Sequence, residues 1–422
     1  MLTQKDLMGL IEYMKKRIMI LAGGNDQCAL IKELRRYFKG NVEIILVDMS
    51  DKVKAISYAD KFLKISTMDK TAVLSAASEE KIDYIFTACG DQPLSTMAYV
   101  SEQLGLPTYL SEKDVRDITN KRFMKDKMVH NDIPTAKHIY IDKKWDGVLP
   151  DFKYPLVVKP VDSNGSKGVK KVFDPSELYS SLREAFRYSL SGDVLIEEFK
   201  SGEELSVDVY VEDTTAKLLS ITASKKIKEN VDSFTIVQSY YPAPINYKEE
   251  RILQIVQKVV DAWQLRNTPL LVQMIVNNDD YNVIEFSARM GGGQKYHLIQ
   301  VLSGVNIMDV YVRMLMGEKP HVNPQKQWNN AIMSYVYCKP GELISIKGFD
   351  EMKDGGTIHS YFTYRTPPSI IEKSDTSSDR VAGFLVVGNF EEEVKNKLSY
   401  ANAHLAVLDS DGKDIMRHDF FV

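Results

Sequence analysis

Cysteine is scarce in this sequence, with three residues in 422, and no CxxC pair occurs among Cys28, Cys89 and Cys338. This spacing offers neither a disulfide framework nor a zinc site, and it is typical of a reducing compartment. No run of about 18 or more apolar residues occurs, so no membrane-spanning helix is predicted. The first residues also lack the apolar core and the cleavage site of a signal peptide. We therefore expect a cytoplasmic protein with no membrane partner.

A large net charge of either sign is also missing. The chain has 54 Lys and Arg against 58 Asp and Glu, a formal net charge of -4, and the two signs are mixed along it. That balance argues against a broad electrostatic attraction to nucleic acid, so no nucleic-acid partner is expected. With 44% hydrophobic and 27% charged residues, the composition is that of an ordinary globular protein with room for two or three domains.

Short apolar strands alternate with amphipathic helical patterns in the first part of the chain. Strands are predicted at 17–22, 42–48 and 84–88, which indicates βαβ units and a parallel sheet. We predict a small doubly wound domain over residues 14–115. The glycines at 23–24 follow the first strand, but they do not form GxGxxG, so a tight strand-to-helix turn is favoured over a dinucleotide site.

The first chemical motif is a strand that delivers Lys159 to a loop rich in glycine and serine. Such a loop brings backbone N–H groups and hydroxyls onto phosphate oxygens, and glycine allows close approach. It is not a Walker loop, and an ordinary solvated hairpin is the alternative. The candidate phosphate-binding residues of the loop are Ser163, Gly165, Ser166 and Gly168.

The second motif is a strand that turns sharply at residues 201–202. The edge of an adenine ring needs one acceptor for its amino group and one backbone donor for its ring nitrogen, and a hinge strand supplies both. Glu204, just past the turn, is placed to accept the ribose hydroxyls. A surface acidic cluster beside a turn is the alternative. The candidate hinge residues are Glu197, Glu198, Phe199 and Lys200.

The third motif is a hairpin with strands at 271–276 and 283–289. Strand alternation puts Gln273 on one face of the first strand, and Glu285 with Ser287 on one face of the second. If these faces coincide, their oxygens suit Mg²⁺, which prefers hard oxygen ligands and is completed by water and phosphate. Arg289 then supplies a planar donor for a transferring phosphoryl group.

The fourth motif follows at once, as three consecutive glycines, Gly291, Gly292 and Gly293. Three glycines in a row carry a large entropic cost on folding. Beside a phosphate site, such a run indicates backbone that approaches a substrate, and a plain flexible linker is the alternative.

Taken together in this order, the four motifs resemble the ATP-grasp superfamily over residues 14 to about 415. The resemblance implies an α/β ATP-grasp fold with a doubly wound pre-ATP-grasp domain at 14–115. An ATP-grasp region at 116–330 follows, with a lid subdomain at about 155–212, and then a C-terminal α+β domain at 331–422. The implied ligands are ATP and Mg²⁺, with Mn²⁺ as a substitute.

The resemblance also assigns roles to individual residues. Lys121 resembles the lysine that opens the ATP-grasp region and contacts phosphate, and Lys159 resembles the second phosphate lysine. Ile275 and Ile284 are implied as the lining of the adenine site. Many members have an acid where Gln273 stands, although members similar to carbamoyl phosphate synthetase have glutamine. Asparagine is usual where Ser287 stands, so Glu285 is the firm metal ligand and Ser287 the doubtful one.

The activity implied is that of an ATP-dependent ligase, which converts a carboxylate to an acyl-phosphate and joins it to an amine. Closure of the loop at 163–168 is expected to exclude water. The stretch at 379–383 is similar to the tail of amino-acid ligases, which favours that type. The alternatives are a purine-pathway enzyme, of the phosphoribosylglycinamide synthetase type or a carboxylating ligase, and an ATP-binding protein without turnover. A homodimer is expected from the resemblance alone. No general base is assigned, and His297, near the glycine run, is as consistent with a structural role.

Overall fold

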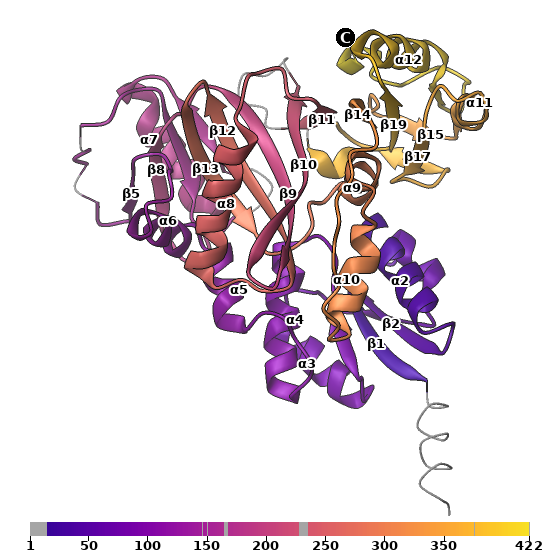
Figure 1. The fold of residues 1–422 in the computed structure, drawn as a ribbon, viewed down its shortest axis with the longest axis horizontal. Coiled ribbons are helices and arrows are strands. Elements are labelled where there is room, and N and C mark those ends of the chain that lie inside the picture. Colours follow the sequence, from indigo (N-terminus) through magenta and orange to yellow (C-terminus); the bar gives the residue numbers. More distant parts are fainter. Residues whose placement is uncertain are drawn as a thin grey trace, which may run out of the picture.

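The computed structural model describes residues 15–145, 147–149, 151–163, 168–227, 235–374 and 376–421. Its first part is a four-stranded parallel sheet in the order β3-β2-β1-β4 (Figure 1). The strands are nearly continuous apolar runs because helices cover the sheet, as is usual for parallel sheets. The doubly wound architecture that the sequence predicts is therefore present. The elements are β1 (Lys16–Leu21), α2 (Asn25–Tyr37), β2 (Val42–Asp48), η1 (Lys54–Tyr58), β3 (Lys61–Lys64), α3 (Lys70–Glu79), β4 (Tyr84–Phe86), α4 (Asp91–Leu104) and α5 (Glu112–Thr119).

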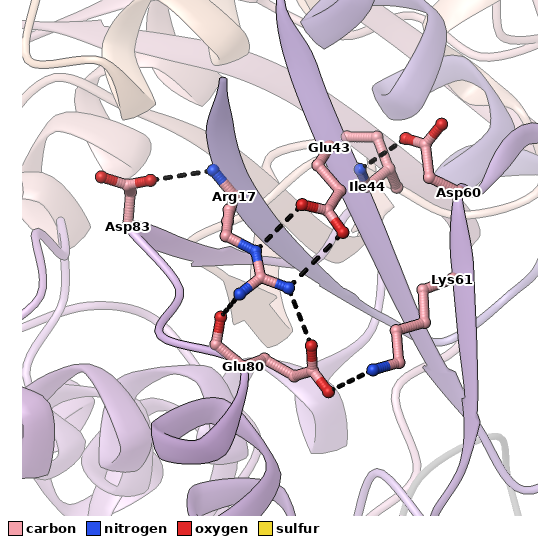
Figure 2. A network of polar contacts seen from close by, with 7 residues as sticks. All are labelled: Arg17, Glu43, Ile44, Asp60, Lys61, Glu80 and Asp83. Carbon is pink, nitrogen blue, oxygen red and sulfur yellow. Dashed lines mark hydrogen bonds and ion pairs between the residues drawn. The ribbon is translucent and has the colours of Figure 1, made fainter. Parts of the chain in front are cut away.

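A polar network joins the beginnings of these strands (Figure 2). Arg17 donates from Nε to Glu43 at 3.0 Å and from Nη2 to Glu80 at 2.9 Å, and its backbone N–H donates to Asp83 at 2.8 Å. Lys61 also contacts Glu80, at 2.5 Å. The partners are partly exposed, so each pair contributes little to stability. The network lies at the amino ends of the parallel strands and leaves their carboxyl ends open to the rest of the chain.

A second, smaller part follows α6 (Lys121–His130) and is an antiparallel sheet in the order β5-β8-β6-β7. It has its own small apolar core, which includes Leu156, Val158 and Ile196. The predicted lid boundaries of about 155 and 212 differ from this sheet, which begins earlier and ends with β8. The elements are β5 (His138–Ile141), β6 (Leu156–Pro160), β7 (Lys170–Val172), α7 (Pro175–Tyr188) and β8 (Val194–Glu198).

The chain leaves the lid at a sharp turn. Gly202 there has φ +149, and a Cβ on it would lie 2.4 Å from the carbonyl oxygen of Val276. This close approach takes the next strand, β9, away from the lid and into a larger sheet, where it pairs with β10 and β12. Glycine is required at this turn because any side chain would meet backbone.

The larger sheet has eight strands in the order β13-β12-β9-β10-β11-β14-β19-β17 (Figure 1). Because β11 pairs with β14, the sheet is continuous across the predicted domain boundary at 330/331. Helix α8 (Glu249–Trp263) packs its apolar face on the β10 side of the sheet. The strands are β9 (Glu203–Glu212), β10 (Thr215–Lys226), β11 (Ile236–Tyr241), β12 (Thr268–Asn277), β13 (Asp280–Ser287), β14 (Asn330–Val336), β17 (Ser360–Thr363) and β19 (Ala382–Gly388).

Short elements complete the C-terminal part around a second apolar core. Strand β19 and helix α12 contribute buried residues to this core, among them Phe384 and Val394. No single helix within the described ranges is long and apolar enough to cross a membrane, and α9 and α10 pass such a test only together, across a bend of 109°. The remaining elements are α9 (Lys295–Ser303), α10 (Ile307–Leu315), β15 (Gly341–Leu343), β16 (Ser345–Lys347), α11 (Phe349–Asp354), β18 (Ser369–Ile371), η2 (Ser377–Asp379), α12 (Glu391–His404), β20 (Ala406–Leu408) and η3 (His418–Phe421). Helix α10 differs from the others because its buried residues join the larger core and it packs against α2.

Candidate functional site

The three residues predicted to hold a metal lie on one face of the β12–β13 hairpin. Gln273 is paired with Glu285 in the strand register, and Leu271 with Ser287. Side chains directly opposite each other in an antiparallel pair lie on the same face. All four are only partly buried, while the alternate residues of both strands face the core. The hairpin therefore presents its oxygen atoms side by side on an accessible surface.

The polar neighbours of this surface leave its oxygens available. Gln273 donates from Nε2 to Glu204 at 3.5 Å, so its Oε1 remains an acceptor. Glu204 also forms an ion pair with Lys226 at 2.5 Å. The Glu285 side chain is 39% exposed and lies 3.9 Å from the Lys121 ammonium. One carboxylate, one amide oxygen and one hydroxyl are a hard donor set that fits Mg²⁺ when water and phosphate complete the shell.

Lys121 is the point at which the predicted residues meet. It is the first residue of α6, and its Nζ donates to the carbonyl oxygen of Ser163 at 2.8 Å. Burial lowers the pKa of Lys121, and Glu285 opposes that shift. Lys159, Asp91 and Glu197 are also close enough to act on its charge. The lid, the hairpin and the N-terminal part thus converge on one ammonium group.

A buried ionic cluster holds the second predicted phosphate lysine. The carboxylate of Glu197, on β8, lies between Lys159 on β6 and Lys125 on α6, with the Lys125 contact at 2.8 Å. The three side chains are 8%, 6% and 1% exposed. Burial by itself would raise the pKa of Glu197, but the two ammonium groups outweigh it and hold the pKa at about 2. Lys125 also donates to the Thr135 hydroxyl at 2.7 Å.

Several hydrogen-bonding groups of the predicted hinge already have partners within the protein. The Glu197 carboxylate is occupied by two lysines, and the N–H groups of Glu198 and Phe199 donate to the Lys137 and Pro155 carbonyls at 2.9 Å and 3.0 Å. The Phe199 ring is covered by Lys171, whose Nζ lies 3.5 Å from the ring centroid. The predicted adenine contacts therefore fall to the carbonyls of the hinge and to the backbone around Lys200.

Other predicted residues lie around these groups. Lys200 forms an ion pair with Asp280 at the hairpin turn, at 3.4 Å. Ile275 and Ile284 are half-buried on the hairpin. Gly168 has φ +73, and a Cβ on it would lie 2.8 Å from the Tyr188 ring, so packing requires glycine there. The predicted loop residues Gly165 and Ser166 fall outside the described residues.

Arg289 is held by the N-terminal part. It forms a bidentate ion pair with Asp91, with Nε to Oδ1 at 3.0 Å and Nη2 to Oδ2 at 2.9 Å. Asp91 is the first residue of α4, and Ser287 also hydrogen-bonds to it. Burial acts to raise the pKa of Asp91, but the guanidinium outweighs burial and lowers it. Glu285 is close enough to act on the Arg289 charge, so the arginine borders the metal face.

The glycine run is packed between the N-terminal and C-terminal parts and is not a free linker. The Gly291 carbonyl accepts from the Cys89 thiol at 3.2 Å, and the Gly293 carbonyl accepts from the Tyr335 hydroxyl at 3.1 Å. A Cβ on Gly292 would lie 3.7 Å from that of Cys89. His297, four residues after Gly293, stacks on Phe362, and burial lowers its pKa to about 4. It is therefore a neutral packing residue near neutral pH.

Sequence patterns missed several residues of the site. Lys125 lies one helical turn after Lys121, a spacing that puts both on one helix face. Asp91 follows β4 at the carboxyl edge of the parallel sheet, where ligands bind in such folds. Helical spacing could therefore have predicted Lys125, and the position after a parallel strand could have predicted Asp91. Arg380 and Asp26 reach the glycine run only through tertiary packing, which no local pattern indicates.

The sequence is similar to a known domain family and to curated proteins. Residues 152–297 match the model of the ATP-grasp domain. Phosphoribosylamine–glycine ligase of Pyrococcus furiosus is 24% identical over 324 residues, which cover 71% of this chain and 72% of that protein.

Two solved structures resemble the whole chain. Phosphoribosylglycinamide synthetase from Anaerococcus prevotii has a TM-score of 0.74 at 20% identity, over 94% of this chain and 100% of that one. L-amino acid ligase from Bacillus licheniformis has a TM-score of 0.73 at 21% identity, over 94% and 99%. At these identities the likeness shows a shared fold.

Proposed function

We propose that this chain, which carries an ATP-grasp domain within an ATP-grasp fold, is an ATP- and Mg²⁺-dependent carboxylate–amine ligase of the amino-acid ligase type. The observation that carries the proposal is the convergence of the hairpin and the lid on Lys121, whose ammonium lies 3.9 Å from Glu285 and donates to the Ser163 carbonyl at 2.8 Å. We assign these cations and oxygen ligands to phosphoryl transfer, which requires both.

The reaction has two steps. A carboxylate oxygen attacks the γ-phosphorus of ATP, which forms an acyl-phosphate and releases ADP. An amine nitrogen then attacks the acyl carbon, the bond to phosphate breaks, and an amide, inorganic phosphate and a released proton result. Lys121 and Lys159 hold the phosphates, and Arg289 donates to the phosphoryl group as its charge spreads. Asp91 orients Arg289 through the bidentate ion pair.

The hairpin residues would hold the metal. Glu285 and the Gln273 amide oxygen would be its ligands, with Ser287 beside them as a weaker donor. The ion would neutralise the charge of the phosphates and so favour transfer.

We expect Glu285→Gln to abolish Mg²⁺-dependent ADP release while the thermal melt of the protein stays unchanged. The matched control is Asp279→Asn at the exposed turn of the same hairpin, which should behave as wild type. Wild-type turnover in Glu285→Gln would remove this residue from the metal site.

The experiment that tests the activity is ADP release from purified protein with MgATP, against pools of amino acids and small carboxylates. Mass spectrometry of the products identifies the pair. We expect ADP only when a carboxylate and an amine are both present, together with a product at their summed mass less water. ADP release that no carboxylate–amine pair stimulates would contradict the proposal. A homodimer is also proposed, and light scattering of the purified chain tests it.

A second candidate is a purine-pathway ligase that uses a phosphoribosylamine and glycine. The length of the match to phosphoribosylamine–glycine ligase favours it, since the matched segment covers 72% of that protein. The same assay, with phosphoribosylamine added to the amines, decides between the two, because only the second candidate gives a product that contains ribose phosphate.

A further inference from the structure

A second buried ion pair lies against the glycine run, apart from the cluster around Glu197. Nζ of Lys295 lies 3.0 Å from Oδ2 of Asp208, and it also donates to the Ser206 hydroxyl. The same Oδ2 accepts a second hydrogen bond from the Ser220 hydroxyl, at 2.7 Å. The Lys295 and Asp208 side chains are only 8% and 3% exposed. Both charges are therefore neutralised inside the protein.

The place of Lys295 in its helix is unfavourable on local grounds. It is the first residue of α9, and no acid occurs in the first turn of that helix. A cation at the amino end of a helix meets the positive end of the helix dipole. The N-cap residue, Gln294, has φ +60, and its side chain makes no capping hydrogen bond. Departures of this kind from the local rules are expected at functional sites.

The alkyl chain of Lys295 touches the glycine run. A Cβ on Gly291 would lie 3.0 Å from Cδ of Lys295 and 3.5 Å from Oδ1 of Asp208. The ion pair therefore packs directly against the backbone of Gly291. The same residue is also held by Cys89, whose thiol donates to the Gly291 carbonyl at 3.2 Å. The first glycine of the run is thus fixed both by the ion pair and by the N-terminal part.

The ion pair is also one strand away from the residues predicted to hold the metal. Ser206 and Asp208 are on β9, and the strand register pairs Ser206 with Gln273 of β12. Side chains opposite each other in an antiparallel pair lie on the same face of the sheet. Lys295 therefore ties the strand beside Gln273 to the glycine run. Arg289 lies two residues before that run, so the segment that carries it is held at this end.

We propose that Lys295 and Asp208 are positioning residues of the proposed ligase, and the inference rests on that function. Their ion pair holds the glycine run in place relative to the face of the β12–β13 hairpin that is predicted to hold the metal. The run is the backbone expected to approach the substrate, so a displaced run misplaces the substrate relative to the phosphoryl group. Small displacements of reacting groups are enough to slow a reaction strongly. The pair is expected to act on kcat and not on the binding of ATP.

A purely structural ion pair is the alternative, and a variant without either charge separates the two. Loss of one member of a buried ion pair is strongly destabilising, whereas replacement of both members is often neutral. Lys295→Met should therefore lower the midpoint of thermal denaturation, and the addition of Asp208→Asn should restore most of it. We expect the double variant still to lose at least about tenfold in kcat for ADP release, with KM for ATP unchanged. A double variant with wild-type kcat would overturn the positioning role.

A second readout needs no turnover. Cys89 is bonded to the glycine run, and burial raises the pKa of its thiol, so little thiolate is available for alkylation. Alkylation by N-ethylmaleimide is followed at each cysteine by mass spectrometry. Cys338 is fully buried in the C-terminal core and reports general opening of the protein. We expect Cys89 to react at least about tenfold faster in the double variant than in wild type, with the rate at Cys338 unchanged.

The two readouts separate failure of the inference from failure of the proposed function. Faster alkylation of Cys89 alone supports the positioning of the glycine run, even where no carboxylate–amine pair yields ADP. An unchanged rate at Cys89 overturns it, whatever the activity of the chain, and so does an equal acceleration at Cys89 and Cys338. Lys397→Met is the matched control, because Lys397 forms an ion pair with Glu393 on α12, at 2.7 Å. It should match wild type in both readouts.

Discussion

Replacing Glu197 by glutamine is the sharpest perturbation that the structure offers. The substitution keeps the shape of the side chain and removes its negative charge. Lys125 and Lys159 would then be two buried ammonium groups without a countercharge, since all three side chains are less than a tenth exposed. Removal of one partner from a buried ion pair costs about 3–5 kcal/mol, because the remaining charge stays desolvated.

The lowered pKa of Glu197 gives a similar value for the free energy that the two lysines contribute. The pKa is held at about 2 against an ordinary value of 4.5, and each unit corresponds to about 1.4 kcal/mol, so the ionised form is favoured by about 3 kcal/mol. The folded-state pKa is lowered, so this stabilisation is complete above the ordinary pKa of the carboxyl group. It is lost as the pH falls from about 4.5 to about 2. The difference between wild type and Glu197→Gln should therefore be constant near neutral pH and shrink in acid.

Hydrogen exchange of the backbone amides in β6 and β8 is the appropriate assay. The lid has a small core of its own, so the loss is expected there and not in a single global transition. A loss of about 3–5 kcal/mol in the free energy of opening corresponds to exchange about 150- to 5,000-fold faster. Glu198→Gln is the control, since its carboxylate is half-buried and, among the residues that the structure describes, accepts only from the Lys153 N–H, at 3.2 Å. If the free energy of opening in Glu197→Gln lies within about 0.5 kcal/mol of that in Glu198→Gln, the buried ionic cluster does not stabilise the lid as described.

Three further predictions concern neighbouring residues. Asp91→Asn removes the negative charge that pairs with Arg289 and one of the two acceptors of the guanidinium. We therefore expect kcat for ADP release to fall at least about tenfold, with KM for ATP unchanged. An unchanged kcat would contradict this role of Asp91. Gly293→Ala places a methyl group against Arg380 at φ +73, so thermal denaturation should show a loss of about 1–3 kcal/mol, and a wild-type melt would count against the packing described. Lys159→Met should weaken ATP binding by about 2 kcal/mol or more in calorimetry, and unchanged affinity would remove Lys159 from the phosphate site.

Much of the architecture is readable in local patterns. The strand at 42–48 is mostly apolar, with four consecutive apolar residues at 44–47, and the structure has β2 (Val42–Asp48) with the same bounds. The short strand β3 (Lys61–Lys64) was missed because it is an edge strand with lysines at both ends and no buried residue. The strand at 203–212 was assigned to the lid because the sequence shows a turn at Gly202 but not the close packing on Val276 that redirects the chain.

Some residues of the candidate site could likewise be predicted from local patterns, and others could not. Gln273 and Glu285 are two residues of one hairpin, so alternation and register suffice to place them on one face. Glu197, Lys125 and Lys159 come from three elements, and their ion pairs depend on how the lid sheet packs on α6. Arg380 lies 354 positions from Asp26, and no periodic pattern relates the two. Sequence alone gives the chemistry of one element at a time, and the pairing of charges between elements requires the tertiary structure.

The acyl-phosphate is the central claim, and transfer of a labelled oxygen tests it most directly. The carboxylate substrate is prepared with heavy oxygen in its carboxyl group and incubated with MgATP, the amine and the purified chain. If the carboxylate attacks the γ-phosphorus, one labelled oxygen must appear in the inorganic phosphate that leaves when the amide forms. Mass spectrometry that finds the label in phosphate, in proportion to amide, is the result that we predict. Amide formed together with unlabelled phosphate would contradict an acyl-phosphate route through this site.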